Sequence, residues 1–372
     1  MRVVVIGTRG IPDIPGGVET HCEQLCPRVA AMGCDVTVVR RSCYVAPDNH
    51  PADDPSIPCD NYKGVKLVDV YAPRRKSIEA IVHTFLATVK ARRLGADVVH
   101  IHTVGPSLMT PLARLLGLKV VCTNHGPDYE RAKWGALARR AIKLGEWCQV
   151  RWAHRIIAIS PSIVDRLKTR YNRTAGVVLI PNGVERPKPC ASHDFLDSHG
   201  IVQGRYVLAV ARFVPEKRLH LLVEAFKRLA MPDVQLVIAG DADHDDEYSM
   251  ALKAQASEAG AILTGYVTGE PLRQLWAGAR LFVLPSSHEG LPISLLEAMS
   301  WQRDVLVSDI AANRLPELRD DDFFAGDSLD SLVAALRRKL NEGTLERNYD
   351  LTAYDWDNIA HATHAVYQSL VQ

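Results

Sequence analysis

Two glutamates stand out in the segment SSHEGLPISLLEAMS. Glu289 follows the apolar run RLFVLP, which is typical of a buried strand, and Glu297 falls inside a stretch of helical character that begins near Pro292. At about 1.5 Å per residue, Glu297 would lie roughly 7 to 8 Å along the axis from the helix start, close to the length of a diphosphate. One carboxylate could therefore meet a sugar and the other a ribose hydroxyl, with the backbone N–H groups of Gly290 and Leu291 directed at phosphates. The alternative is an ordinary surface helix.

Two cations follow another predicted strand. Arg212 ends YVLAVAR and Lys217 comes after FVPE, so both would lie beside the same helix start. Fixed cations stabilise the negative charge that a departing nucleoside diphosphate develops, which makes a divalent metal unnecessary. The alternatives are a solvated charged loop at Arg212 and a metal held by the Asp-x-Asp pattern of Asp241 and Asp243, which we interpret instead as a solvated acidic loop.

Glycines mark the first turn of the chain, TRGIPDIPGGVETHCEQL. Gly16 and Gly17 would allow the backbone to approach a phosphate or a sugar before a helix begins. The spacing is not that of a G-x-G-x-x-G dinucleotide motif, and the strand DVTVV is followed by Arg40 and Arg41 rather than by an acid that would bind the NAD ribose. A nicotinamide enzyme is therefore disfavoured.

Histidines also occur at predicted strand ends. We interpret His102 as a structural, hydrogen-bonded and neutral residue, whereas His125, in a loop beside a glycine, suits contact with a sugar hydroxyl. Cys22 and Cys26 with His21 do not provide a full set of zinc ligands. No metal ion and no other cofactor is expected.

Short β-branched runs alternate with helical stretches along the whole chain, which predicts two α/β domains with mainly parallel sheets, joined near positions 181–189. Such sheets bind ligands beyond the carboxyl ends of their strands, and facing strand ends would enclose a cleft. The strands are predicted in RVVVIG, DVTVVR, VKLVDVY, DVVHIH, KVVCTN, RIIAIS, RYVLAVAR, VQLVIAG, AILTGY, RLFVLPS and DVLVSD.

The composition limits the class of protein. The 372 residues are 47% hydrophobic, no apolar run is long enough to span a bilayer, and the start MRVVVIG does not resemble a signal peptide, so a cytoplasmic protein with reduced cysteines is expected. Up to Glu185 the chain has 26 Lys and Arg against 16 Asp and Glu, and after it 18 against 27. The basic first half suits an anionic partner. Nucleic acid is disfavoured because only 6% of residues are aromatic and no recognition helix is apparent.

These residues resemble glycosyltransferase family 4, the retaining enzymes of the GT-B fold with two facing Rossmann-like domains. The resemblance covers the whole chain, and the Glu-x7-Glu motif is its most specific part. It implies that Glu289 lies by the transferred sugar, Glu297 by the ribose, and Arg212 and Lys217 by the diphosphate. It also implies that Gly16 and Gly17 close over the diphosphate and that His125 faces the sugar.

The resemblance implies an acceptor-binding domain over 1–183, a nucleotide-sugar domain over 184–353 and a helix over 354–372 that returns to the first domain. TRGIP, PGGVET and ERAKW are similar to a bacterial subgroup often assigned as rhamnosyltransferases of surface-polysaccharide assembly. We expect retaining transfer of a hexose or deoxyhexose, with UDP or dTDP as the nucleotide. The alternatives are an epimerase or phosphorylase on the same fold, or a non-catalytic nucleotide-binding subunit.

The segment 131–155 is basic, with apolar residues at helical spacing that include Leu137 and Leu144. Such a helix could lie on the anionic cytoplasmic face of a membrane and present a glycan or lipid-linked acceptor. Packing on the protein's own sheet is the alternative. The candidate acceptor or membrane residues are Arg131, Lys133, Arg139, Arg140 and Lys143.

Overall fold

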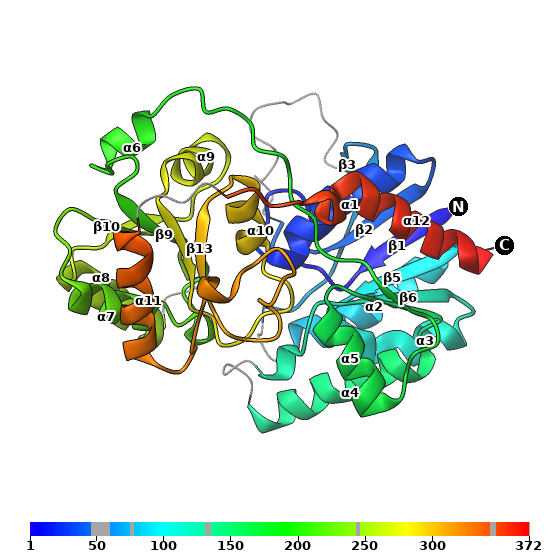
Figure 1. Cartoon of the computed structure of the whole chain (residues 1–372). Helices are drawn as coiled ribbons and strands as arrows, with labels where there is room; N and C mark the ends of the chain where they lie inside the picture. Colours follow the sequence, from blue (N-terminus) through cyan, green and yellow to red (C-terminus); the bar gives the residue numbers. More distant parts are fainter. Residues whose placement is uncertain (46–59, 75–77, 131–134, 243–245, 343–346, 372) are drawn as a thin grey trace. The chain divides into compact units, whose positions relative to one another are not determined.

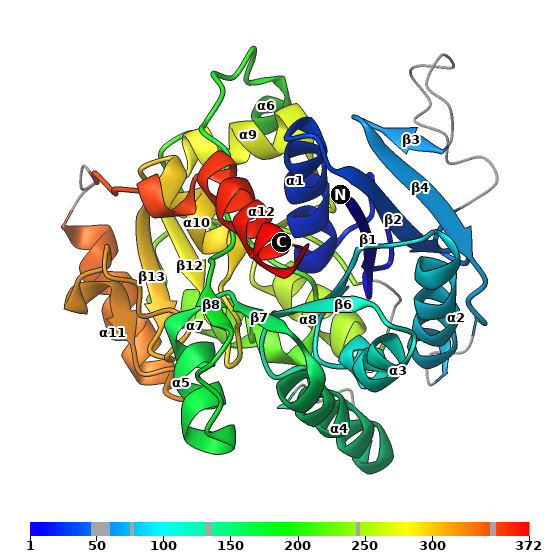
Figure 2. The same ribbon diagram turned by 90° about the vertical axis from the view of Figure 1, so that its right-hand side faces the viewer.

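The structure is a computed structural model that describes residues 1–45, 60–74, 78–130, 135–242, 246–342 and 347–371 (Figures 1 and 2). The chain divides into two compact units. Unit 1 comprises Met1–Gly183 and Ala353–Gln372, and unit 2 comprises Val184–Thr352. Each is an α/β unit built on one sheet, as the alternating pattern of the sequence predicts.

The sheet of unit 1 has the strand order β3-β4-β2-β1-β5-β6-β7-β8, and only β3 runs antiparallel to its neighbour. The β-branched runs form its central strands because both faces of a parallel sheet are covered by helices. The prediction missed β3 and β8, which are too short to leave a periodic pattern. The strands are β1 (Arg2–Ile6), β2 (Asp35–Arg41), β3 (Asn61–Tyr62), β4 (Val65–Val70), β5 (Val98–His102), β6 (Lys119–Asn124), β7 (Arg155–Ala158) and β8 (Val177–Leu179).

Two helices from opposite ends of the chain, α1 (Gly17–Ala31) and α12 (Trp356–Val371), lie side by side on one face of this sheet (Figures 1 and 2). The return of the C-terminal helix to the first unit is thereby confirmed. Trp356 is buried against Gly183, where an added Cβ would lie 2.4 Å from the indole. The remaining helices and 3-10 turns of unit 1 are α2 (Glu79–Arg93), η1 (Pro106–Met109), α3 (Thr110–Leu115), η2 (Asp128–Glu130), α4 (Ala136–Trp152), α5 (Pro161–Tyr171) and η5 (Thr352–Tyr354), which starts at the unit boundary.

The sheet of unit 2 is parallel, with the order β11-β10-β9-β12-β13-β14. Helices α7, α8 and α11 bury their apolar faces on one side of it, and α9 and α10 lie on the other (Figure 1). The strands are β9 (Tyr206–Val210), β10 (Gln235–Ala239), β11 (Ile262–Gly265), β12 (Leu281–Leu284), β13 (Asp304–Ser308) and β14 (Phe323–Phe324). The helices are α6 (Asp194–Ser198), η3 (Pro215–Lys217), α7 (Leu219–Leu229), α8 (Glu247–Glu258), α9 (Gly269–Gly278), α10 (Ile293–Ser300), η4 (Asp320–Asp322) and α11 (Leu329–Asn341).

Both strand orders contain a point at which the direction of the connections reverses. In unit 1 it lies between β1 and β5, and in unit 2 between β9 and β12, as in the Rossmann order 3-2-1-4-5-6. Loops that follow the two strands at such a point diverge and leave room for a ligand. The chemically suggestive residues of the sequence follow these strands or their immediate neighbours.

Candidate functional site

The reversal point of unit 2 brings together two loops that are far apart in the sequence. Lys217 ends the turn after β9, and Glu289 lies in the loop after β12. Lys217 Nζ donates to Glu289 Oε1 at 2.6 Å, with side chains that are 19% and 9% exposed. The backbone N–H of Ser287 donates to the carbonyl of Glu216 at 2.9 Å, which fixes one loop against the other. The structure thus places a paired cation and carboxylate at one sheet edge.

Helix α10 starts beside this ion pair. Pro292 occupies the N-cap position and the helix begins at Ile293, one residue later than the sequence suggests. Proline offers no side-chain acceptor, so it does not cap the N–H groups of the first turn. Gly290 and Leu291 immediately precede the helix, and Leu291 is buried. The start of α10 is therefore suited to accept an anionic ligand group.

Glu297 lies within α10, on the helix that starts next to Glu289. Burial and, to a smaller extent, the nearby carboxylate of Glu185 together raise the pKa of Glu297 from 4.5 to about 7. The folded protein therefore retains a proton at near-neutral pH that the unfolded chain has released. A protonated carboxyl can donate a hydrogen bond, whereas the ionised form only accepts.

The pKa of Glu297 has a consequence for stability. Below about pH 4.5 the folded and the unfolded states both hold the proton, so Glu297 does not lower the free energy of unfolding. Between pH 4.5 and 7 the free energy of unfolding falls as pH rises. The full loss corresponds to roughly 3 kcal/mol above pH 7. We expect Glu297→Gln to raise the free energy of unfolding by about 2 to 3 kcal/mol at pH 8.5 and by much less at pH 5.5, measured by urea denaturation. Glu258→Gln, on the exposed end of α8, is the matched control. An equal effect of Glu297→Gln at both pH values would contradict this assignment.

Arg212 lies two residues beyond the end of β9 and is half-buried. The neighbouring Phe213 N–H donates to the carbonyl of Asp241 at 3.0 Å, which ties this loop to the end of β10. The carboxylate of Asp241 pairs with Lys253 at 2.9 Å. Asp243 lies outside the described residues. Asp241 is thus engaged by a lysine of α8.

In unit 1 the glycine loop contains a carboxylate that sequence reasoning missed. Glu19, in the first turn of α1, is buried and accepts hydrogen bonds from Thr8 Oγ1 at 3.1 Å and from the Arg9 N–H at 2.9 Å. Gly16 is the N-cap of α1 at φ 149°, and a Cβ there would lie 2.1 Å from Glu19 Oε2. Gly17 is the first residue of the helix. Only glycine at position 16 therefore leaves room for the carboxylate that shapes this loop.

Three histidines converge at the carboxyl edge of the unit 1 sheet. His102 ends β5, His125 follows β6, and His21 comes from α1. His102 Nδ1 lies 3.0 Å from His125 Nε2, and His21 Nδ1 lies 3.0 Å from Asn182 Oδ1. Burial lowers the pKa of His102 well below its usual value, and the neighbouring histidines lower it further. No pattern in the sequence connects His21 with the other two histidines.

Helix α4 exposes both apolar and basic side chains. Gly145 allows it to pack closely, since a Cβ there would meet the Val104 carbonyl at 2.1 Å. The apolar residues at helical spacing do not all lie on one buried face. Cys148 is buried, whereas Leu137 and Leu144 are 81% and 48% exposed. The exposed residues on this helix include Leu137, Arg139, Arg140, Lys143, Leu144, Trp147 and Arg151.

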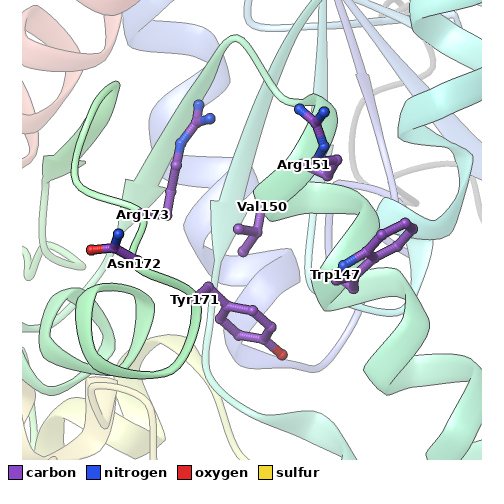
Figure 3. A pocket seen from close by; sticks show the side chains of 6 residues that line it. All are labelled: Trp147, Val150, Arg151, Tyr171, Asn172 and Arg173. Carbon is purple, nitrogen blue, oxygen red and sulfur yellow. The ribbon is translucent and has the colours of Figure 1, made fainter.

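A pocket lies beside this surface, between the end of α4 and the end of α5 (Figure 3). The lining side chains combine an exposed indole with two arginines, and they are Trp147, Val150, Arg151, Tyr171, Asn172 and Arg173. Lys143 differs from Arg139 and Arg140 because its Nζ lies 5.3 Å from the ring centroid of Tyr129. Arg131 and Lys133 lie outside the described residues.

The chain has two Rossmann-like units, a C-terminal helix that returns to the first, and the ion pair of Lys217 with Glu289 at the reversal point of the second. Together these features define the GT-B class of glycosyltransferases. Family comparison agrees: residues 15–186 match the family model described as Glycosyltransferase Family 4, and residues 204–342 match Glycosyl transferases group 1. The chain is a glycosyltransferase of the family 4 and group 1 type.

Individual relatives extend this result over the full chain. Alpha-maltose-1-phosphate synthase of Mycolicibacterium smegmatis is 26% identical, with 100% of both chains covered. A UDP-Gal:alpha-D-GlcNAc-diphosphoundecaprenol alpha-1,3-galactosyltransferase of Escherichia coli is 29% identical over 67% of each chain. The solved structure of sucrose-phosphate synthase from Thermosynechococcus elongatus has a TM-score of 0.81 at 19% identity and covers 99% of this chain and 98% of that one. The structural likeness supports the fold.

Proposed function

We propose that this glycosyltransferase moves a hexose or deoxyhexose from a UDP- or dTDP-sugar to a glycan or lipid-linked acceptor in bacterial polysaccharide synthesis, with retention of configuration. The observation that carries the proposal is the ion pair of Lys217 with Glu289 at the reversal point, beside the start of α10. A nucleotide sugar has a diphosphate next to a sugar, and these two side chains offer a cation for one and a carboxylate for the other.

Each proposed donor contact has a distinct task. Lys217 and Arg212 neutralise the diphosphate as the bond to the sugar breaks, and the N–H groups near Gly290 and Leu291 support them. Glu297 binds the ribose. Glu289 orients the sugar and stabilises its developing positive charge, so that no metal ion is required for transfer.

The proposed tasks of the unit 1 residues rest on the family resemblance. Gly16 and Gly17 contribute to diphosphate binding, and His125 contacts the sugar. The acceptor hydroxyl attacks from the face that the diphosphate leaves, and a leaving phosphate oxygen takes the proton. A deoxyhexose is included because TRGIP and PGGVET resemble the rhamnosyltransferase subgroup. UDP is included because the Escherichia coli relative named above uses UDP-Gal.

A panel of UDP-, dTDP-, GDP- and ADP-sugars in a thermal-shift assay tests the donor. At one hundred times its Kd a donor stabilises the fold by about 2.7 kcal/mol, which is readily measured as a rise in Tm. The stabilising donor is then incubated with and without acceptor. Acceptor-dependent release of nucleotide supports the transferase. Turnover without any acceptor would indicate an epimerase or phosphorylase, and binding without turnover would indicate a nucleotide-binding subunit.

We further propose that α4 contacts an anionic membrane that carries the acceptor. Leu137, Leu144 and Trp147 supply exposed apolar surface on the same helix as Arg139 and Arg140. Among the described residues, none of the helices is both long and apolar enough to cross a bilayer. The acceptor in the name of the Escherichia coli relative is alpha-D-GlcNAc-diphosphoundecaprenol, a sugar linked to a lipid through a diphosphate. Surface contact through α4 would bring such an acceptor to unit 1.

Liposome co-sedimentation tests this surface. The Arg139→Ala/Arg140→Ala/Lys143→Ala variant should lose about 3 kcal/mol of binding to anionic vesicles, at roughly 1 kcal/mol for each charge near the surface. The Lys227→Ala/Arg228→Ala/Arg337→Ala variant removes equal charge from exposed positions of unit 2 and should bind like the wild type. Since Lys143 also contacts Tyr129, the Arg139→Ala/Arg140→Ala pair separates charge from packing. Equal sedimentation of all variants would exclude α4 as the membrane contact.

A further inference from the structure

The convergence of His21, His102 and His125 is not explained by sugar transfer alone. One ring nitrogen of each lies within 4.8 Å of the others, and the ring centroids are 5.0 to 5.4 Å apart. His21 and His102 are buried and His125 is half-buried. Three imidazoles on three different elements, α1, β5 and the loop after β6, therefore meet at one place in unit 1.

The spacing of two of these rings matches a metal centre. His102 Nδ1 and His125 Nε2 lie 3.0 Å apart. Two nitrogens bound to a tetrahedral zinc at about 2.0 to 2.1 Å lie roughly 3.3 Å from each other, so only a small movement would be needed. His102 Nε2 is buried and has no hydrogen-bond partner among the described residues. The hydrogen bonds of the cluster thus leave one His102 nitrogen unsatisfied.

The third histidine is oriented in the manner of a metal ligand. The Oδ1 atom of Asn182 can only accept a hydrogen bond, so His21 Nδ1 carries the proton and its Nε2 keeps a lone pair. Metal-binding histidines characteristically donate their other N–H group to an oxygen in this way. The tautomer that Asn182 selects thus leaves His21 Nε2 able to bind a metal ion.

We propose that His21, His102 and His125 form a binding site for a divalent transition metal, with Zn²⁺ as the preferred ion and Asn182 as the residue that orients His21. Imidazole nitrogens suit zinc, cobalt and nickel, whereas Mg²⁺ and Ca²⁺ prefer oxygen ligands. Three protein ligands leave a fourth position for water or another small ligand.

The proposed metal is not part of sugar transfer. If the proposed function is correct, His125 cannot bind both the ion and the sugar, so Zn²⁺ should inhibit transfer and EDTA should restore it. Metal binding itself does not depend on that function. The test therefore measures binding without any nucleotide sugar, so the two proposals can fail separately.

Titration of the metal-free, untagged full chain with Co²⁺ provides the direct test. The wild type should bind one equivalent and develop the visible absorption of four- or five-coordinate cobalt, which Zn²⁺ then abolishes. His21→Gln should weaken binding at least tenfold, and Asn182→Ala should weaken it about 10- to 100-fold. His220→Gln, which replaces an exposed histidine of unit 2, is the matched control and should bind like the wild type. Circular dichroism verifies that each variant is folded.

Three results would overturn the site. The first is a wild type that binds no Co²⁺, and the second is a folded His21→Gln variant that binds it as tightly as the wild type. The third is strong near-ultraviolet charge transfer from sulfur to cobalt, which would assign the metal to thiolates such as Cys22 and Cys26 of α1. If His21→Gln does not fold, His125→Asn and Asn182→Ala decide between the same outcomes.

Discussion

Glu289→Ala is expected to lower kcat for sugar transfer by about 100- to 1,000-fold while leaving nucleotide binding largely intact. In the proposed site the Glu289 carboxylate opposes the positive charge that develops on the sugar, and removal of one such preorganised group has effects of this size. The same substitution removes the partner of Lys217, which lies 2.6 Å away. Lys217 then becomes fully available to the diphosphate, so affinity for the nucleotide should be unchanged or higher.

Initial rates with the identified donor and acceptor measure the first effect, and calorimetric titration with the nucleoside diphosphate measures the second. Glu258→Ala removes a carboxylate from the exposed end of α8 and should change neither quantity. Unchanged turnover in Glu289→Ala would remove this residue from the reaction. Parallel losses of turnover and nucleotide affinity would instead indicate a role in folding the loop after β12.

Arg212→Ala/Lys217→Ala should weaken binding of the nucleoside diphosphate by about 10²- to 10⁴-fold. Hydrogen bonds to charged groups contribute roughly 1.5 to 3 kcal/mol each, and the proposed site has two such cations and no metal for the diphosphate. Transfer by the wild type should accordingly continue in EDTA. Calorimetric titration of both proteins under identical salt conditions gives the difference in affinity.

Lys217→Ala alone leaves the nearly buried carboxylate of Glu289 without its cation. The effect of this single variant therefore includes the cost of an unpaired buried charge. Combining Lys217→Ala with Glu289→Ala completes a double-mutant cycle and separates the ion pair from the contact with the diphosphate. Lys227→Ala/Arg228→Ala is the charge-matched control on α7. Nucleotide affinity that is the same in Arg212→Ala/Lys217→Ala as in the wild type would refute the diphosphate assignment.

Much of the fold could be predicted because parallel strands covered on both faces must be continuously apolar. This constraint made β1, β5, β9 and β12 visible as short β-branched runs, and their order along the chain predicted two α/β units. Strand ends are also visible in a sequence. The positions of Arg212 and Glu289 after strands were therefore predictable, although their roles in catalysis remain predictions.

Short elements and buried polar contacts could not be predicted from apolar patterns in the sequence. β3, β8 and β14 have two or three residues each, too few for a periodic pattern. Glu19 resembles any acidic residue in the first turn of a helix until the structure places its carboxylate on the backbone of the glycine loop. The sequence pattern also did not decide which face of α4 is exposed, because apolar residues occur on more than one side of that helix.

The sequence by itself determined the class of each segment, the residues that follow its strands and the chemical groups they offer. Tertiary structure alone decided which of these groups meet. Lys217 pairs with Glu289 because β9 and β12 are neighbours in the sheet, and His21 of α1 joins His102 and His125, which lie at the carboxyl ends of the neighbouring strands β5 and β6. The physical reason is that local patterns report burial and backbone conformation, whereas encounters between distant side chains depend on strand order and helix packing.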